Sequence, residues 1–276
     1  MKIYISFDFE GINGVSKFSQ VENKNKQEIE KSLYQAYKEI QAVINGALKS
    51  GVEYITINDA HSAMTNLDLN HLDDRISLIT GKPKPISMMA GLDQSYNAAI
   101  LLGYHARAGA PGACLAHTLI DEILNVKING IAVGEAYLNS LYAASLNVPI
   151  AMASGDEALK EEIYQQIGEI PTVCIKKALG YNSVECRPNS IILNDLEETT
   201  FKTLTNPSSW IINKVPSPYD MEVELSQIIM ADLVELIPGV NRTSSRKINY
   251  THIDFSTIYK LLQTICIIVG SAKNYY

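Results

Sequence analysis

The sequence predicts an α/β fold of three layers, in which a mostly parallel sheet has helices on both faces and a smaller α+β part is added. Short strand-like runs alternate with helical runs in the first half of the chain, as in parallel sheets. Several of these strand-like runs are apolar throughout, which is typical of strands covered on both faces. The chain of 276 residues is 46% hydrophobic and 19% charged, enough for one large or two modest globular domains.

The first predicted strand covers residues 2–10, where apolar side chains alternate with polar ones. Because successive strand side chains point to opposite faces, Asp8 and Glu10 project from the same side. Two neighbouring carboxylates repel each other near a core unless a cation or a shared proton compensates them. A lone pair of this kind could equally be a solvent-facing strand end, so its meaning depends on its neighbours.

A strand, a helix and a second strand follow one another at the start of the chain. Residues 26–50 carry apolar side chains at helical spacing, and Gly51 ends the predicted helix. Residues 53–58 form the next predicted strand, which leads directly into Asp59 and His61. This order is the parallel crossover unit, so the two strands are expected to lie side by side.

A third strand end also carries a polar group. Residues 64–96 are rich in turn-forming residues and are predicted to be irregular, apart from a short strand at 76–79. The apolar run at 98–104 predicts a strand buried on both faces, and it ends on His105.

The rest of the chain completes the first predicted part and then forms a second part with a different pattern of predicted elements. A hairpin at 126–133 around an Asn-Gly pair precedes Glu135. Further elements are expected as a helix at 136–146, a strand at 148–153, a helix at 155–167, a strand at 173–176, a helix at 191–204, strands at 210–215, 219–225, 234–239 and 249–253, and a helix at 254–269. We therefore expect an α/β metal-binding catalytic domain at 1–188, with an irregular insertion near 64–96. A smaller α+β part at 189–276 would serve packing, assembly or pocket shape.

Composition argues against several classes of protein. The net charge of −7 and the lack of a Lys/Arg-rich run argue against nucleic acid as a partner. The N-terminus lacks the pattern of a signal peptide, so a cytoplasmic protein is expected. The apolar stretch at 258–269 is short and interrupted, so no membrane partner is expected. The four cysteines form no CxxC pair, which argues against disulfides and thiolate zinc sites.

Three predicted strands end on residues that can bind a metal. The carboxyl ends of parallel strands meet at one edge of a sheet, so these residues can converge. The residues at these three strand ends are, in chain order, the pair Asp8 and Glu10, the pair Asp59 and His61, and the single residue His105. Carboxylate and imidazole together favour zinc or a similar transition metal over magnesium or calcium. With Glu135 added, the ligands suffice for two ions, which indicates a hydrolase.

Each of these residues also has a simpler interpretation. His105 alone could be a hydrogen-bonded core histidine, and Glu135 could be an exposed turn residue. Asp59 could be a turn residue or could orient the imidazole of His61, and we expect the second. Cys114 and His117 could suggest a cysteine nucleophile, but closeness in sequence rarely makes a catalytic pair.

Five short motifs together carry a resemblance to a known family. They are Ser6-x-Asp8-x-Glu10-Gly11, Asn58-Asp59-x-His61-Ser62, Gly103-Tyr104-His105-Ala106, Ala116-His117 and Val133-Gly134-Glu135. In this order they resemble the M55 family of D-aminopeptidases, whose known members include zinc peptidases of bacterial dipeptide-transport operons. The resemblance runs from the first strand to about residue 156 and continues more weakly to the C-terminus.

The resemblance implies a dinuclear zinc exopeptidase. In that family pattern Asp8 bridges the two metals, Glu10 and His61 complete one site, and His105 and Glu135 complete the other. It also implies that His117 is the catalytic histidine. Subunits would form a ring-shaped homodecamer whose active sites face an internal channel.

The expected function is a zinc-dependent aminopeptidase that removes an N-terminal residue, D-Ala or another small D-residue, from short peptides. A metal-activated water would attack the peptide carbonyl. One alternative is another dinuclear metallohydrolase, such as an amidase or an L-specific aminopeptidase. A phosphoesterase is disfavoured because no phosphate-binding glycine-rich loop is present. A second alternative, from a different class, is a non-catalytic peptide-binding protein.

Overall fold

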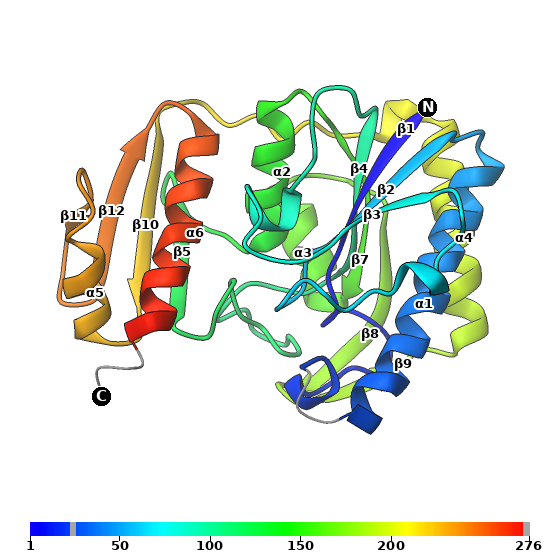
Figure 1. The fold of residues 1–276 in the computed structure, drawn as a ribbon, viewed down its shortest axis with the longest axis horizontal. Helices are drawn as coiled ribbons and strands as arrows, with labels where there is room; N and C mark the ends of the chain where they lie inside the picture. Colours follow the sequence, from blue (N-terminus) through cyan, green and yellow to red (C-terminus); the bar gives the residue numbers. More distant parts are fainter. Residues whose placement is uncertain (23–25, 273–276) are drawn as a thin grey trace.

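Two sheets of different size organise the molecule. The computed structural model describes residues 1–22 and 26–272, and Figure 1 shows the larger sheet beside the smaller one. The larger sheet has the strand order β3-β2-β1-β4-β7-β8-β9 and the smaller one β11-β12-β10-β5-β6. All neighbours in the larger sheet are parallel except β8 and β9. The predicted fold class, a mostly parallel sheet with an added α+β part, is confirmed.

The elements have the following bounds. The strands of the larger sheet are β1 (Lys2–Phe7), β2 (Tyr54–Asp59), β3 (Ile76–Ile79), β4 (Ala98–Tyr104), β7 (Ile150–Asp156), β8 (Thr172–Gly180) and β9 (Ser183–Cys186). Those of the smaller sheet are β5 (Ile123–Ile128), β6 (Ile131–Ala132), β10 (Tyr219–Leu225), β11 (Asn241–Arg242) and β12 (Lys247–His252). The α-helices are α1 (Lys26–Lys49), α2 (Glu135–Ser145), α3 (Glu157–Gln166), α4 (Asn189–Thr205), α5 (Ile228–Val234) and α6 (Phe255–Ala272).

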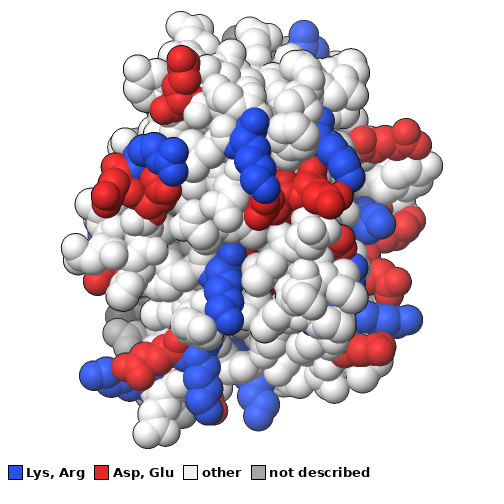
Figure 2. Space-filling view, turned by 90° about the vertical axis from the view of Figure 1, so that its right-hand side faces the viewer, with Lys and Arg blue, Asp and Glu red and all other residues white. Residues whose placement is uncertain are grey.

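Helices cover both faces of the larger sheet. Figure 1 shows α1 and α4 on one face, with α2 and α3 on the other. Strand β4 therefore contributes to two cores: Ile100 packs on the α1 side and Leu101 on the α2 side. On the outer surface over α1 and α4, acidic and basic side chains are mixed rather than separated by sign (Figure 2).

The close packing of α1 against α4 depends on Gly46. A Cβ atom at this position would lie 2.4 Å from the carbonyl oxygen of Glu197 on α4. Because α4 lies on the larger sheet, residues beyond 188 contribute to the predicted catalytic part. The hairpin β5-β6 in turn pairs with β10 in the smaller sheet. The two sheets therefore do not separate at residue 188, because strand pairing joins segments that are distant in sequence.

Two predicted strands in the last third differ from the structure. Residues 210–215 form no regular strand, and Ile211 makes only a single bridge to Ile150. Val234 is the last residue of helix α5, and residues 235–239 follow it as a turn instead of forming a strand. Both stretches contain apolar residues without forming a strand, because an apolar side chain can be buried without its backbone pairing with a neighbouring strand.

Helix α6 lies between the smaller sheet and α2 (Figure 1). Among the described helices it alone is long and apolar enough to cross a membrane, a test that core helices of globular domains also pass. Its buried side chains include Phe255, Ile258 and Leu262, which belong to the core shared with α2.

Candidate metal centre

The carboxyl ends of β1, β2 and β4 lie side by side. In the parallel register Phe7 of β1 pairs with Asp59 of β2 and with Leu102 of β4. Asp8 and Glu10 follow β1 immediately, and the other predicted ligands follow the neighbouring strands. The expected convergence at one edge of the sheet is therefore present.

Two glycines allow the chain after β1 to approach β4. The amide of Gly11 donates to the carbonyl of Gly103 at 2.8 Å. A Cβ atom at Gly11 would lie 2.1 Å from the carbonyl oxygen of Tyr104. At Gly103, where φ is +75°, it would lie 2.2 Å from the carbonyl oxygen of Asp8. Only glycine avoids both the steric overlap and the left-handed strain, so these residues hold Asp8 against the end of β4.

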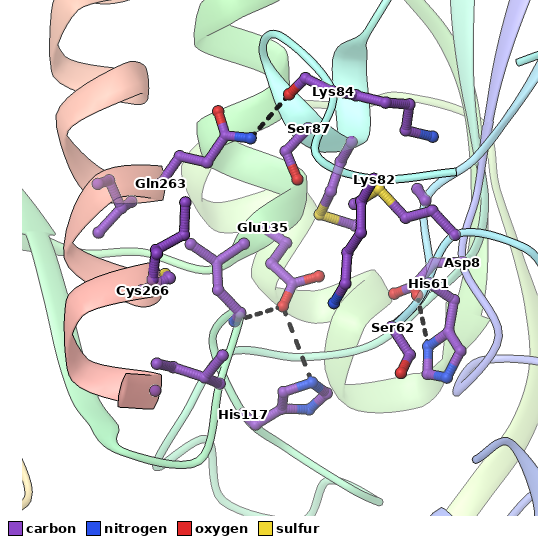
Figure 3. A pocket seen from close by; sticks show the side chains of 18 of the residues that line it. Asp8, His61, Ser62, Lys82, Lys84, Ser87, His117, Glu135, Gln263 and Cys266 are labelled. Carbon is purple, nitrogen blue, oxygen red and sulfur yellow. Dashed lines mark hydrogen bonds and ion pairs between the residues drawn. The ribbon is translucent and has the colours of Figure 1, made fainter. Parts of the chain in front are cut away.

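The buried side chains form two groups that share Asp8. His61 Nδ1 lies 2.9 Å from Glu10 Oε2 and 3.4 Å from Asp8 Oδ1. His105 Nε2 lies 3.4 Å from Asp8 Oδ2 and 3.4 Å from Glu135 Oε2. The two oxygens of Asp8 therefore face different imidazoles, which is the arrangement of a bridging ligand. Figure 3 shows Asp8, His61 and Glu135 at the base of a pocket.

Backbone carbonyls set the tautomer of both imidazoles. The Nε2–H of His61 donates to the carbonyl of Val21 at 3.1 Å, and the Nδ1–H of His105 donates to that of Ala106 at 3.0 Å. Because a carbonyl can only accept, the proton of each neutral ring lies on the nitrogen that faces it. His61 Nδ1 and His105 Nε2 then direct lone pairs toward the carboxylates, as metal-binding histidines do.

The residues present fit a pair of metal ions. Asp8 Oδ2, Glu10 Oε2 and His105 Nε2 are buried, and the described residues give them no hydrogen bond. An acceptor buried in this way costs about 1–3 kcal/mol, which a cation would offset. The sets Asp8-Glu10-His61 and Asp8-His105-Glu135 each place their ligand atoms within 4.8 Å of one another. Carboxylate with imidazole suits zinc or a similar transition metal.

In the metal-free protein, protons compensate part of this charge. Burial and the neighbouring carboxylate of Glu10 raise the pKa of Asp8 to about 7. Burial opposes the charged form of His61, but Glu10 and Asp8 outweigh it and raise the pKa of the imidazole well above its ordinary value. The pKa of His105 is raised in the same way, mainly by Glu135 against the effect of burial. Metal binding therefore has to displace protons from this centre.

His117 lies beside the two groups that share Asp8, and with Glu10 and His105 it forms a third set whose ligand atoms lie within 4.8 Å of one another. Its Nδ1–H donates to the carbonyl of Leu115 at 2.7 Å, which leaves the lone pair on Nε2. That atom is 3.8 Å from Glu10 Oε1 and 4.0 Å from Glu135 Oε1. The ring stacks on His105 with centroids 4.1 Å apart. A neutral imidazole fixed in this tautomer can accept a proton at the edge of the centre.

Glu135 is the first residue of α2, and its carboxylate is held by the chain after His117. The amide of Leu119 donates to Glu135 Oε1 at 2.6 Å, so the other oxygen faces His105. Leu119 has a φ of 66°, a backbone conformation that is unusual for a branched residue. The contact therefore links the segment carrying His117 to the candidate metal ligands.

Asp59 does not orient the imidazole of His61, as the sequence suggested. Its carboxylate accepts from the amides of Asn66 and Leu67 at 2.5 and 2.9 Å. The side chain of Asn66 also donates to the carbonyl of His61 at 2.8 Å. Asp59 thus fixes the chain that follows His61, while the carbonyl of Val21 orients the ring. Any residue supplies a carbonyl, so the sequence carried no signal for this contact.

Lys176, which is buried on β8, is a further residue that supports the centre and that the sequence pattern did not reveal. Its Nζ donates to the carbonyls of Glu10, Ile12 and Val15 at 2.5, 2.9 and 2.6 Å. Burial lowers the pKa of this ammonium. A lysine at the end of the apolar run at 173–175 was the only hint in the sequence. Lys176 therefore holds the segment that carries Glu10.

Glu39 of α1 holds the same segment from a second direction. Its Oε1 accepts from the amide of Asn13 at 3.0 Å and from Gln35 Nε2 at 2.9 Å. Burial raises the pKa of Glu39 to about 7. The loop after β1 is thus fixed by groups from α1 and β8 before any ligand binds.

A cavity of about 920 Å³ opens above the centre. Asp8, Glu10, His61, His117 and Glu135 contribute to its lining, together with residues 82–84 and 87–88 and with side chains of α2 and α6 (Figure 3). Cys114 lies outside this lining, and burial raises the pKa of its thiol. An inert buried thiol agrees with the rejection of a cysteine nucleophile.

The carboxyl ends of the parallel strands gather buried carboxylates and imidazoles below an open cavity, and three of their ligand atoms have no hydrogen bond within the described residues. This arrangement defines a metal-dependent hydrolase. The family model Peptidase_M55, described as D-aminopeptidase, matches residues 1–264, so the chain belongs to this family. The resemblance noted in the sequence is confirmed, and the protein is a metallo-aminopeptidase.

Two relatives support the assignment. The chain is 30% identical over 263 residues to the D-aminopeptidase of Bacillus subtilis (strain 168), covering 95% of each. It is also similar to the solved structure of the Zn-dependent D-aminopeptidase DppA from Bacillus subtilis, a self-compartmentalizing protease. The TM-score is 0.94 and the identity 28%, with 98% of each chain covered. The similarity thus extends over both sheets.

Proposed function

We propose that the protein is a zinc-dependent D-aminopeptidase that removes D-Ala or another small D-residue from the N-terminus of short peptides. The observation that carries the proposal is the shared position of Asp8 between two groups of buried ligands. Asp8, Glu10 and His61 would hold one ion, and Asp8, His105 and Glu135 a second. The related solved structure is described as Zn-dependent, and the ligand set here suits the same metal.

When bound, zinc lowers the pKa of water and polarises a carbonyl group. The side chains of the protein then have separate tasks. His117 Nε2, with its lone pair facing the centre, can take a proton from the nucleophile and return it to the leaving amine. The Leu115 carbonyl keeps the imidazole in this tautomer. The acidic base of the cavity favours a substrate that presents a free N-terminal ammonium group.

The cavity and the relatives support a small substrate and an assembled enzyme. Its volume of about 920 Å³ lies within the range of pockets that bind small molecules, about 300–1,000 Å³. We propose a ring-shaped homodecamer with its active sites facing an internal channel. The description of the related structure as a self-compartmentalizing protease supports such an assembly. Light scattering on purified protein would measure the number of subunits.

Metal analysis and paired substrates test the proposed activity. Purified protein should contain about two zinc ions per chain, and it should hydrolyse D-alanyl amide faster than L-alanyl amide. His117→Ala should keep the zinc and lose about 10²–10⁴-fold in kcat. A zinc-loaded wild type that cleaves neither amide, or a His117→Ala variant as active as the wild type, would contradict the proposal.

A further inference from the structure

Lys82 is a cationic side chain of the cavity that the proposed mechanism does not use. It belongs to the cavity lining, and Figure 3 shows its amine pointing toward the centre. Within residues 1–22 and 26–272 the structure gives its ammonium group no hydrogen bond and no ion pair. A lysine that extends into a cavity without a protein partner is available to a ligand.

The segment that carries Lys82 is held on both sides. The amide of Gly81 donates to the carbonyl of Met64 at 2.5 Å. On the other side Lys84 Nζ donates to Asn58 Oδ1 at 2.6 Å, and Gln263 of α6 donates to the carbonyl of Lys84 at 2.8 Å. Since both neighbours are fixed, the backbone of Lys82 has a defined position and only its side chain has freedom.

Lys82 differs in charge from the acidic residues of the cavity lining, and it differs from Lys84 in having a free ammonium group within the described residues. The acidic residues of the lining include Asp8, Glu10 and Glu135 at the base, which favour the amino end of a peptide. The lysines of the lining are Lys82 and Lys84. Lys84 already donates to protein acceptors, and burial lowers its pKa to about 8. Lys82 is therefore the lysine of this lining that can meet an anionic group of the substrate.

We propose that Lys82 binds the C-terminal carboxylate of a short peptide and so favours free di- and tripeptides over amidated or longer ones. The inference rests on the proposed aminopeptidase function, since the amino end has to lie at the metal centre. An extended chain advances about 3.5 Å per residue, so two or three residues span roughly 7–10 Å from there. A carboxylate at that distance stays within the cavity that Lys82 lines, and Lys82 points its amine into this cavity (Figure 3).

The test compares free acids with amides. The wild type should hydrolyse D-Ala-D-Ala with a higher kcat/KM than its C-terminal amide. Lys82→Ala should lower this acid-to-amide ratio on the order of tenfold, mainly through a higher KM for the acid, whereas kcat/KM for the amide should change less than kcat/KM for the acid. Lys82→Arg should keep the preference, and Lys82→Glu should reverse it. Lys260→Ala, which removes an exposed lysine of α6 outside the cavity lining, should leave the ratio at the wild-type value.

A binding measurement separates this proposal from the proposed catalysis. Calorimetric titration of zinc-loaded His117→Ala protein with the free acid and with the amide gives the ratio of their affinities without turnover. The titration is repeated on a protein that also carries Lys82→Ala. A ratio that falls with Lys82→Ala supports carboxylate binding even if no peptide is cleaved. An acid-to-amide ratio that Lys82→Ala leaves unchanged in both kinetics and binding overturns the role of Lys82, whatever the activity of the enzyme.

Discussion

Replacing Lys176 with methionine should destabilise the segment that carries Glu10. The change removes hydrogen bonds from a charged donor to three buried carbonyls, 2.5–2.9 Å from Nζ. Each unpaired acceptor costs about 1–3 kcal/mol, and the apolar methionine offsets part of the sum by removing a buried charge. We expect a net loss of about 3–5 kcal/mol in the free energy of unfolding. Because Glu10 moves with its carbonyl, zinc affinity should fall about 10–100-fold.

Two measurements check this prediction. Urea unfolding of chelator-treated protein gives the stability, and titration against a zinc buffer gives the affinity. Lys177→Met is the matched control, because its exposed ammonium makes only a 3.8 Å ion pair with Glu157 and should contribute under about 1 kcal/mol. A Lys176→Met protein that is less stable but binds zinc like the wild type would refute the positioning of Glu10. Unchanged stability would refute the reasoning altogether.

Three further predictions concern the centre and the loop that supports it. Because both groups of ligands share Asp8, Asp8→Asn should reduce the bound zinc below two ions per chain and lower kcat by at least about 10³-fold. Metal analysis that finds the full zinc content would contradict this. Glu39 has a folded pKa of about 7 against an ordinary 4.5, so the folded state retains a proton that the unfolded state releases, and stability falls as pH rises through this window by about 3 kcal/mol. Glu39→Gln should flatten that dependence in urea unfolding between pH 4.5 and 8, whereas an unchanged slope would assign it to other groups. Gly103→Ala should lose several kcal/mol and zinc binding together, because the added Cβ would lie 2.2 Å from the carbonyl of Asp8 at a φ of +75°; a wild-type melting temperature would argue against this close approach.

The residues that could carry the chemistry were already recognisable in the amino-acid sequence. The alternation in β1 places Asp8 and Glu10 on one side, and the apolar run of β4 predicts a doubly covered strand that ends near His105. Both patterns are local, because they follow from the direction in which neighbouring side chains point. Parallel pairing then makes convergence at the sheet edge an expectation before any coordinate is known.

How these residues are held, and which strands belong to which sheet, depends on contacts that form only in the folded chain. Lys176 reaches the carbonyl of Glu10 across 166 residues, and the ring of His61 is oriented by the carbonyl of Val21. The hairpin β5-β6 joins β10 instead of the larger sheet. Such contacts use main-chain groups that every residue possesses, so no residue type marks them in the sequence. They arise only when the folded chain brings distant segments together.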